Sequence, residues 1–418
     1  MRILHIITQK PYATGSGVYL SGIIAQLGKR HQQYLICGLN DEEEKDLPTS
    51  SIPLIIDPVI FERAMLNFPV PGMSDVMPYR SSRYGQLTMQ QADQLMVAFL
   101  DKVKLAVTSF QPDVILCQHL YLVTATLTLK LRSQGIVGAD VPILGICHGS
   151  EIRQFKTTDR WRDLIRSGIG QLDGIISTHQ EQATEIVQLF GVSPHRIRIL
   201  GSGFNPEIFK PNPRMSKLDP PLKIVFTGKL SNAKGVPELL KACDLLAKDH
   251  LIHLTLIGSG ADPLEFEAIK AAAGNKPYPV VLTGQLNQTD ISRIYQQSHL
   301  FILPSYYEGM PLVVPEALAC GMGVVVTDLP GFSTWLGPFI DRVGLIEPPE
   351  MIDLNEPSEV SRQKFIGDIA KTAEELLGRM DNTKVPDLSA MTWQGLSLRI
   401  EEFMKDLKTN QRDDLSLV

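Results

Sequence analysis

Short apolar runs alternate with stretches of helical periodicity along most of the chain. In the first half, the apolar runs that suit buried strands are Ile3–Ile7, Tyr34–Cys37, Val114–Cys117, Pro142–Cys147, Gly174–Ser177 and Ile197–Leu200. The helical patterns between them cover Val18–Leu27, Met89–Ser109, Leu120–Leu131 and Glu181–Phe190. Strands that are apolar throughout and separated by helices predict a parallel sheet with both faces covered.

A proline cluster interrupts this alternation, with five prolines in the sixteen residues from Pro206 to Pro221. After it, strands are expected at Lys223–Thr227, His253–Ile257, Val280–Thr283, Leu300–Leu303 and Gly323–Thr327, and helices near Pro237–Leu246, Asp290–Gln297 and Pro315–Ala319. We therefore predict two doubly wound α/β domains, residues 1–208 and 222–389, joined by a linker of residues 209–221. Ligands of such sheets bind beyond the carboxyl ends of the strands, which points to a cleft between the domains.

Composition and charge argue against several other classes of protein. A net charge of −6 over 418 residues gives no support to a nucleic-acid partner. No stretch approaches the ~18 apolar residues of a membrane span, and the apolar run at Ile3–Ile7 is too short for a signal peptide. The five cysteines are far apart and lack metal-ligand spacing, so we expect buried, reduced thiols. A cytoplasmic protein is expected, with peripheral contact at the inner face of the membrane left open.

The strongest local signal runs from Leu300 to Gly321. A buried strand ends at Pro304, Glu308 follows it, and Pro315 lies in the first turn of the next helix. Backbone amides before that helix would favour a diphosphate, and a carboxylate can accept two hydrogen bonds from a vicinal diol. That chemistry suits Glu316 to a ribose and Glu308 to a hexose. On spacing alone, a helix whose two acids merely complement its dipole fits equally well.

These residues also carry a resemblance. The run E-G-M-P-L-V-V-P-E-A-L-A-C-G, residues 308–321, resembles the E-x7-E element of retaining glycosyltransferases with the GT-B fold, in particular glycosyltransferase family 4. Further motifs in the family's order are Thr14–Val18 (glycine loop), His148–Gly149 (H-G motif), Gly203–Phe209 (closing turn), Gly228–Gly235 (phosphate loop) and Trp393 with the helix after it. The likeness covers nearly the whole chain.

The resemblance implies a fold, a reaction and a set of site residues. It implies two facing Rossmann-like domains, with residues 390–418 packing back on the first, and transfer of a sugar from a UDP-sugar to a hydroxyl acceptor with retention. Residues expected to take part in catalysis are His148, Glu308 and Lys234. Residues expected to bind the donor are Gly15, Ser16, Gly17, Lys229, Lys234, Gly258, Leu286, Glu308, Gly309, Met310, Pro311, Leu312, Val313 and Glu316.

Several of these residues also have plain structural alternatives. Gly15–Gly17 is placed between the first strand and the first helix, where small residues let the backbone approach a phosphate, but an ordinary turn fits too. Lys229 and Lys234 follow a strand and can neutralise a leaving diphosphate as point charges, unless they are ordinary surface lysines. His148 ends an apolar run, where a histidine is more often structural. The family usually has arginine at the position of Lys229.

Excess positive charge in the first domain points to an anionic acceptor. Arg80 and Arg83 lie in the irregular segment Asp57–Gln90, and Arg153 and Lys156 lie in a basic run after His148. Such residues could receive a phosphorylated or carboxylated molecule, or lipid headgroups, or could simply form a solvated helix face. The expected partners are a nucleotide-sugar donor and a sugar, small-molecule or lipid-linked acceptor.

Neither a metal nor another cofactor is expected, because the chain contains no Asp-x-Asp motif and the lysines can supply the counter-charge. Two other functions stay open from the sequence. One is a different enzyme on the same fold, a sugar-nucleotide epimerase or a phosphorylase. The other is a non-catalytic subunit that binds a nucleotide sugar.

Overall fold

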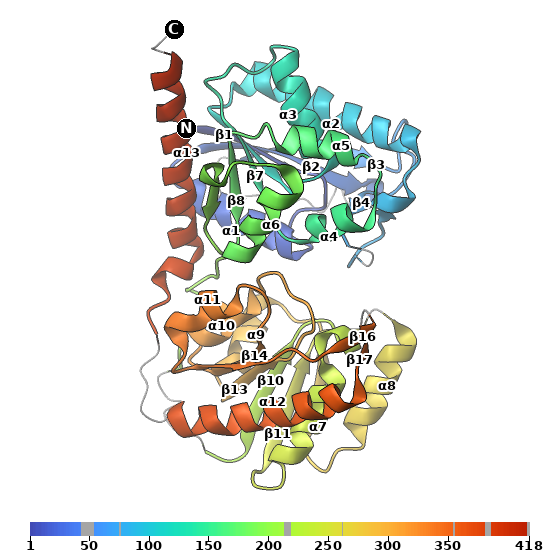
Figure 1. Cartoon of the computed structure of the whole chain (residues 1–418), viewed down its shortest axis with the longest axis vertical. Helices are drawn as coiled ribbons and strands as arrows, with labels where there is room; N and C mark the ends of the chain where they lie inside the picture. Colours follow the sequence, from blue (N-terminus) through green and yellow to red (C-terminus); the bar gives the residue numbers. More distant parts are fainter. Residues whose placement is uncertain are drawn as a thin grey trace. The chain divides into compact units, whose positions relative to one another are not determined.

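The computed structural model describes residues 1–42, 54–74, 77–212, 219–260, 262–353, 356–380 and 386–415, without the side chains of 410–415. The chain forms two compact units (Figure 1). Unit 1 consists of Met1–Gly203 and Trp393–Val418, and unit 2 of Phe204–Thr392. The division falls just ahead of the proline cluster, and residues 213–218 of the expected linker lie outside the described residues.

Unit 1 is built on a parallel sheet of order β3-β2-β1-β6-β7-β8-β9. Its strands are β1 (Arg2–Ile7), β2 (Gln32–Asn40), β3 (Leu54–Phe61), β6 (Val114–Gln118), β7 (Ile143–Ile146), β8 (Gly174–Ser177) and β9 (Ile197–Ile199), with β4 (Pro71–Gly72) and β5 (Ser82–Arg83) paired separately. The strand order reverses between β1 and β6. The carboxyl ends of these two strands therefore flank the crevice where such sheets bind ligands.

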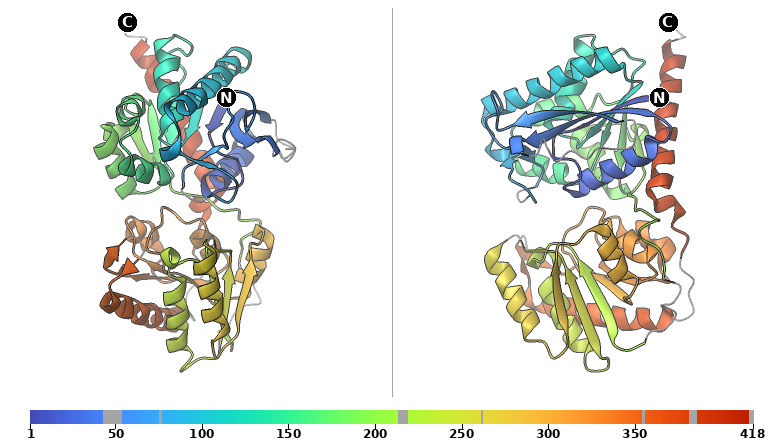
Figure 2. Two further views of the ribbon diagram at one scale, coloured as in Figure 1. Left: turned by 90° about the vertical axis from the view of Figure 1, so that its right-hand side faces the viewer. Right: turned by 180° about the vertical axis from the view of Figure 1, so that it is seen from behind.

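Helices cover both faces of this sheet, as the apolar strands require. They are α1 (Gly15–Leu27), α2 (Met89–Phe110), α3 (Leu122–Ser133), α4 (Ser150–Thr157), α5 (Arg162–Ile169), α6 (Gln180–Phe190) and α13 (Trp393–Leu415). Figure 2 shows α2 on one face and α1 on the other, with α13 running beside α1. The sequence thus correctly predicted that the last helix returns to the first domain.

Unit 2 repeats the pattern with a sheet of order β12-β11-β10-β13-β14-β15. Its strands are β10 (Leu222–Thr227), β11 (Ile252–Ile257), β12 (Val280–Gly284), β13 (Leu300–Leu303), β14 (Gly323–Thr327) and β15 (Val343–Ile346). Its helices are α7 (Val236–Leu246), α8 (Pro263–Gly274), α9 (Gln288–Tyr295), α10 (Val313–Ala319), α11 (Phe332–Leu336) and α12 (Glu359–Met380). Here the order reverses between β10 and β13, so their carboxyl ends flank the second crevice.

The segment Asp57–Gln90 was predicted to be irregular, and this was wrong at its start. Residues from Asp57 to Phe61 belong to β3, which is the edge strand of the sheet. Pro58 weakens the sequence signal for a strand, but an edge strand tolerates proline because one side of it makes no ladder hydrogen bonds. Residues 75 and 76 of this segment lie outside the described residues.

The cores of both units and the cysteines match the prediction of buried apolar strands. Each sheet is packed between aliphatic and aromatic side chains of its own helices. All five cysteines are buried and free, as expected. Among the described residues, no helix has both the length and the apolarity needed to cross a bilayer.

Candidate functional site

The crevice of unit 2 is formed by two loops that lie against each other. One follows β10 (Gly228–Gly235), and the other follows β13 (Pro304–Met310). The Tyr306 amide donates a hydrogen bond to the carbonyl oxygen of Ala233 at 3.0 Å. Gly235 has φ of +65°, and a Cβ there would lie only 2.1 Å from the carbonyl oxygen of Pro304. Glycine is therefore required at this position for the loops to approach so closely.

Lys234 and Glu308 form an ion pair at this point. The Lys234 Nζ lies 2.6 Å from Glu308 Oε1, and their side chains are 24% and 14% exposed. The same ammonium donates to the carbonyl oxygen of Tyr307 at 3.3 Å, and the Ser305 hydroxyl donates to Glu308 Oε1 at 2.8 Å. The two residues that the sequence assigned to catalysis in this unit are thus in direct contact.

Lys229 brings a second ammonium group to the same place. Burial lowers the pKa of Lys229, the neighbouring charge of Lys234 lowers it further, and Glu308 opposes both effects. The crevice thus holds two lysines that repel each other and one carboxylate close to both. An anion that binds both ammonium groups would relieve that repulsion, which is the setting a phosphate needs.

Glu316 lies inside unit 2, on α10, with only 5% of its surface exposed. Burial raises the pKa of Glu316 to about 8, and no described side chain hydrogen-bonds to its carboxyl group. Tyr295 is close enough for the Glu316 charge to help raise its own pKa, after burial. A buried carboxyl group without a hydrogen bond does not fit the alternative of an exposed acid that complements a helix dipole, and it suits a ligand that brings its own hydroxyl groups.

The other expected donor-binding residues of unit 2 lie along the same edge of the sheet. Gly309, Met310, Pro311 and Leu312 form the half-buried turn before α10, and Val313 begins the helix. Gly258 follows β11, and its amide donates to the carbonyl oxygen of Gly284 at 2.9 Å. Leu286 is half-buried against the core of the unit. Their contact with a donor stays a prediction.

The expected glycine loop of unit 1 is not a loop. Gly15, Ser16 and Gly17 form the first turn of α1, and the Thr14 side chain caps the helix by accepting a hydrogen bond from the Gly17 amide at 3.1 Å. Threonine at this position starts a helix even when glycines follow. The Ser16 hydroxyl also donates to Gln9 Oε1 at 3.3 Å. These residues lie at the amino end of a helix, and phosphate contact there stays a prediction.

His148 lies in the crevice of unit 1, just after β7. Its Nε2 is 2.8 Å from Gln118 Oε1, and its ring meets those of Tyr19 and His119 at centroid distances of 5.1 and 5.0 Å. The His148 amide donates to Glu151 Oε1 at 2.9 Å, and Glu151 is fully buried. The imidazole is thus fixed by contacts on several sides.

His148 is held as a neutral imidazole. Burial lowers the pKa of His148 to about 3, the neighbouring His119 lowers it too, and Glu151 opposes them. A neutral ring donates at one nitrogen and accepts at the other, and the contact with Gln118 Oε1 suits the tautomer that has its N–H at Nε2. The sequence analysis did not find Gln118, His119 or Tyr19 as neighbours of His148, because they come from three distant segments.

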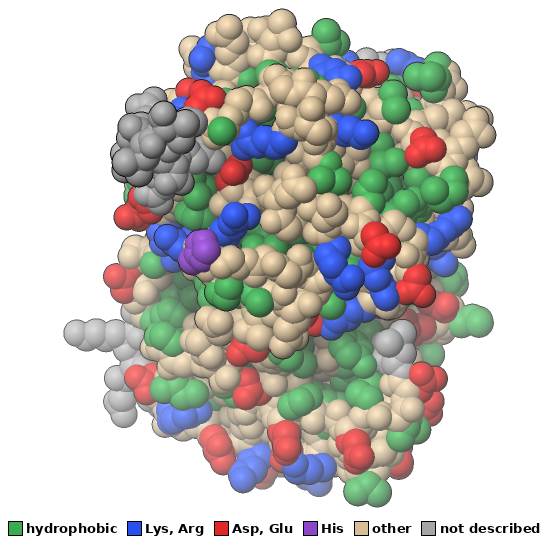
Figure 3. Space-filling model, turned by 45° about the horizontal axis from the view of Figure 1, so that its top comes forward, with side chains coloured by type: hydrophobic (Ala, Val, Ile, Leu, Met, Phe, Trp, Pro, Cys, Tyr) green, Lys and Arg blue, Asp and Glu red, His purple; other side chains and the backbone are tan. Residues whose placement is uncertain are grey.

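Two of the four basic residues expected to bind the acceptor are paired with acids. Arg80 pairs with Glu62 at 2.9 Å, and Lys156 pairs with Glu185. Arg83 and Arg153 are exposed. On the face drawn in Figure 3, Lys and Arg side chains are interspersed with acidic and hydrophobic ones. Binding of an acceptor by these four residues stays a prediction.

Three neighbouring arginines of the same basic run serve the fold. Arg160 and Arg166 donate to the carbonyl oxygens of Leu87 and Leu189, at 2.6 and 2.9 Å. Arg162 donates to the carbonyl oxygen of Phe155 at 3.2 Å. Their guanidinium groups hold backbone in place, so they add less to a free positive surface than the sequence suggests.

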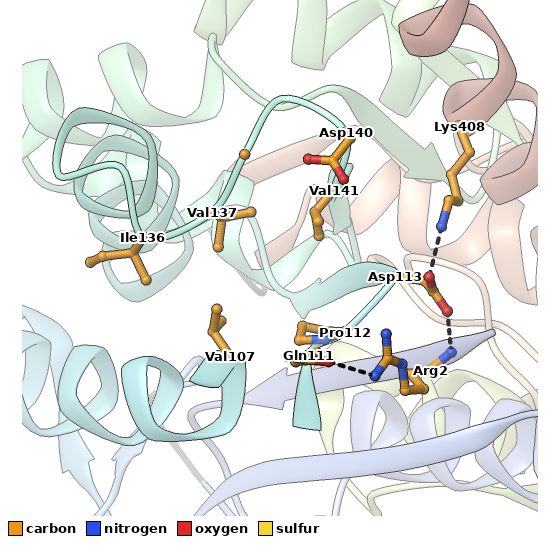
Figure 4. Close-up of a pocket in the computed structure, with 11 residues that line it drawn as sticks. Arg2, Val107, Gln111, Pro112, Asp113, Ile136, Val137, Asp140, Val141 and Lys408 are labelled. Carbon is orange, nitrogen blue, oxygen red and sulfur yellow. Dashed lines mark hydrogen bonds and ion pairs between the residues drawn. The ribbon is translucent and has the colours of Figure 1, made fainter. Parts of the chain in front are cut away.

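A cavity of about 280 Å³ in unit 1 lies away from this crevice (Figure 4). It is lined by Arg2, Asp113 and Val141, which stand at the amino ends of β1, β6 and β7, and by Lys408 of α13. Ligands of parallel α/β sheets bind at the opposite, carboxyl ends. No group of three or more His, Cys, Asp or Glu side chains within the described ranges is arranged to hold a metal ion.

Comparison with known proteins decides the family. The family model for glycosyl transferases group 1 matches residues 210–356, and the model for Glycosyltransferase Family 4 matches residues 13–208. The chain belongs to the family 4 glycosyltransferases. The family 4 match covers most of unit 1, and the group 1 match lies in unit 2.

Curated relatives match part of the chain. An uncharacterized glycosyltransferase of Methanocaldococcus jannaschii is 28% identical over 169 residues, which cover 38% of this chain and 43% of the relative. D-inositol 3-phosphate glycosyltransferase 2 of Catenulispora acidiphila is 27% identical, over 39% of this chain and 42% of the relative. The chain thus matches less than half the length of these relatives.

Solved structures match nearly the whole chain and show the fold. Sucrose-phosphate synthase from Thermosynechococcus elongatus gives a TM-score of 0.67 at 16% identity, over 98% of this chain and all of that one. HepE of Anabaena, solved in complex with UDP, gives 0.68 at 15% identity, over 97% of this chain and all of that one. The predicted GT-B fold of two Rossmann-like domains is confirmed.

Proposed function

We propose that this chain is a retaining glycosyltransferase that transfers a hexose from a UDP-sugar to a hydroxyl acceptor. The observation that carries the proposal is the Lys234–Glu308 ion pair, 2.6 Å long, beside Lys229 at the carboxyl ends of β10 and β13. A diphosphate leaving group needs positive charge that is already in place when the bond to the sugar breaks.

Each polar group of the unit 2 crevice has a proposed partner on the donor. Lys234 and Lys229 bind the diphosphate, aided by the backbone amides of Gly309–Val313. The carboxyl group of Glu316 accepts hydrogen bonds from the ribose diol, and Glu308 accepts them from the sugar. Gly258 and Leu286 border the base. When the diphosphate binds, Lys234 contacts both the diphosphate and Glu308. Its contact with Glu308 is then weaker, so the carboxylate can accept hydrogen bonds from the sugar hydroxyl groups.

The choice of uridine rests on the family resemblance and on related structures. HepE of Anabaena has been solved with UDP-glucose, whereas starch synthase IV of Arabidopsis thaliana has been solved with ADP and acarbose. Both share the fold at low identity, so the base must be tested directly. A panel of UDP-, ADP- and GDP-sugars, followed by thermal shift and then by product analysis, identifies the donor.

The same panel separates transfer from the other reactions of this fold. Transfer yields a glycoside whose anomeric configuration, measured by NMR, equals that of the donor. Interconversion of free UDP-sugars would instead show an epimerase, dependence on inorganic phosphate a phosphorylase, and tight binding without turnover a binding subunit. Any of these three results contradicts the proposal.

We also propose that the acceptor is anionic and that Arg153 and Lys156 bind it. The D-inositol 3-phosphate glycosyltransferases among the relatives carry a phosphorylated compound in their name. Lys156 is paired with Glu185 at the surface, and exposed ion pairs of this kind contribute only about 0–1 kcal/mol, so an incoming anion can replace the partner. His148 is proposed to serve the transfer step.

Transfer is proposed to proceed without a metal ion, with the two lysines as counter-charge. Activity should therefore survive an excess of EDTA. Loss of activity in EDTA, with recovery on adding magnesium or manganese, contradicts this part of the proposal.

A further inference from the structure

A row of three rings connects the first residue of α13 to His148. Tyr19, on α1, meets the Trp393 indole edge-on at a centroid distance of 5.8 Å and an interplanar angle of 84°. The Tyr19 ring also meets the His148 ring, at 5.1 Å and 81°. Tyr19 and Trp393 are 2% and 6% exposed. Edge-to-face ring pairs have a preferred geometry, so each ring of the row favours a particular placement of the next.

Two positions without a side chain make room for the indole. A Cβ on Gly22 of α1 would lie 2.3 Å from Trp393 Cδ2, and a Cβ on Gly203 would lie 2.3 Å from Trp393 Cε3. These distances are far below a normal contact between carbon atoms. Trp393 is therefore enclosed by α1 on one side and by the end of the first segment of unit 1 on the other.

The rest of α13 is fixed to unit 1 by ion pairs. Glu401 contacts Arg30 at 2.8 Å and His31 at 3.3 Å. Lys408 contacts Asp113 at 2.9 Å, beside the cavity shown in Figure 4. Two separate anchors thus hold the helix along its length and keep Trp393 against Tyr19.

His148 has contacts besides the Tyr19 ring. Gln118 holds its Nε2, and the His119 ring packs against it at 5.0 Å. The Tyr19 ring is a third neighbour of the imidazole. Both printed contacts of Tyr19 in this row are made by its ring.

We propose that Trp393, acting through Tyr19, positions the His148 imidazole for transfer, so that docking of α13 on unit 1 sets the geometry of the reaction. Both are positioning residues, since neither is proposed to touch a substrate. This inference rests on the proposed role of His148 in transfer. It adds that the C-terminal helix controls that role from outside the crevice.

The test uses two truncations and two readouts. Trp393→Leu and Tyr19→Leu should each lower kcat by about threefold to tenfold, because displacing the His148 ring costs no more than the hydrogen bond that the ring supplies. Nucleotide affinity and the donor KM should stay within twofold. In protein labelled with ¹⁵N-histidine, the ring signals of His148, assigned by their loss in His148→Gln, should shift in both variants.

Matched variants separate positioning from loss of stability. Phe403, also buried on α13, packs near Gly174 and Arg198 and not on Tyr19, so Phe403→Leu should lower the melting temperature and leave kcat within twofold. Tyr19→Phe keeps the ring and should restore full kcat. Should a truncation fail to fold, Trp393→Phe and Gly22→Ala give smaller displacements of the same contact.

The two readouts also distinguish the possible failures. Unchanged His148 ring signals, or equal kcat losses in Trp393→Leu and Phe403→Leu, overturn the positioning proposal. If the ring signals shift but no nucleotide sugar is turned over by the wild-type protein, the positioning stands and the proposed function has failed.

Discussion

The carboxyl edges of the two sheets differ in how they hold their polar groups. In unit 2 the crevice contains an ion pair, Lys234–Glu308, with Lys229 next to it. In unit 1 the crevice contains His148 between Tyr19, Gln118 and His119, with burial lowering the pKa of both histidines to about 3. The same fold thus presents charge on one sheet and neutral, tightly packed groups on the other.

Burial explains the neutral groups in both units. It removes solvent from acid and base alike and favours whichever form has no charge. Glu316 therefore holds its proton up to about pH 8, whereas His148 loses its second proton above about pH 3. The comparison teaches that unit 2 is suited to a charged ligand, and unit 1 to positioning a neutral hydrogen-bonding group.

The largest expected effect comes from the charged crevice. Lys234→Ala should lower turnover about 100–1000-fold, because it removes charge from the leaving diphosphate. Lys270→Ala, which removes an exposed lysine paired with Glu267 on α8, is the matched control and should stay within twofold. A fall of less than threefold in Lys234→Ala would show that unit 2 does not act through this charge.

Adding Glu308→Gln to Lys234→Ala sharpens the same comparison. Glu308 is proposed to bind the sugar while Lys234 binds the diphosphate, so the double variant should turn over about tenfold more slowly than Lys234→Ala alone, the effect of one further lost hydrogen bond. Equal turnover in the two variants would mean that Glu308 acts only as the partner of Lys234.

The second effect is on stability and concerns Glu316. Its folded-state pKa of about 8 lies above the ordinary value of 4.5, so the folded state binds the proton more tightly than the unfolded state. The contribution of the protonated Glu316 to the free energy of unfolding is fully present below pH 4.5 and is lost as pH rises to about 8. Between pH 5 and 7, wild type should lose about 2–3 kcal/mol relative to Glu316→Gln. The free energy of unfolding of both proteins is measured by urea at each pH. If it changes by the same amount between pH 5 and 7 in both, Glu316 is not buried and neutral.

The third effect tests the neutral crevice. His148→Ala should lower turnover about tenfold, the effect of one lost hydrogen bond, and leave the melting temperature within a few degrees. Because the His148 pKa is about 3, this histidine should not titrate near pH 6.5. The pH–rate profiles of wild type and His148→Gln should therefore have the same shape in that range. If His148→Ala unfolds, the histidine is structural.

The smallest effect concerns the surface of unit 1. Replacing Arg153 and Lys156 together by glutamine should raise the acceptor KM about fivefold and leave the donor KM unchanged, since exposed charge pairs are weak. High salt should have the same effect on wild type, because exposed charges are screened within ~8–10 Å. A neutral acceptor, or an unchanged KM in the double variant, would end the idea of an anionic acceptor.

Much of the fold could be predicted from the sequence because buried parallel strands have a clear apolar pattern. The pattern failed where the environment is not fully buried. Pro58 hid the edge strand β3, and the short charged helices α4 and α5 carry few apolar residues. The start of α1 was missed because Gly15 and Gly17 suggest a loop, whereas the Thr14 cap starts the helix.

The candidate site was predicted in its residues but not in its contacts. Motif order singled out Lys234, Glu308 and His148, yet no spacing rule indicates that Lys234 and Glu308 form an ion pair, or that Trp393 reaches His148 through Tyr19. Such contacts depend on loops that meet only in the folded chain. The sequence likewise overstated the basic surface, because it does not show which arginines bind backbone carbonyls.

Calorimetric titration of UDP, ADP and GDP tests the central difference between the units most directly. One of these nucleotides, UDP first, should bind wild type. Glu316→Ala should lose about 1–3 kcal/mol of that affinity, the effect of two neutral hydrogen bonds to the ribose, and His148→Ala should bind as wild type does. If none of the three binds wild type, or if His148→Ala loses the affinity while Glu316→Ala keeps it, the assignment of the donor to the charged crevice of unit 2 is wrong.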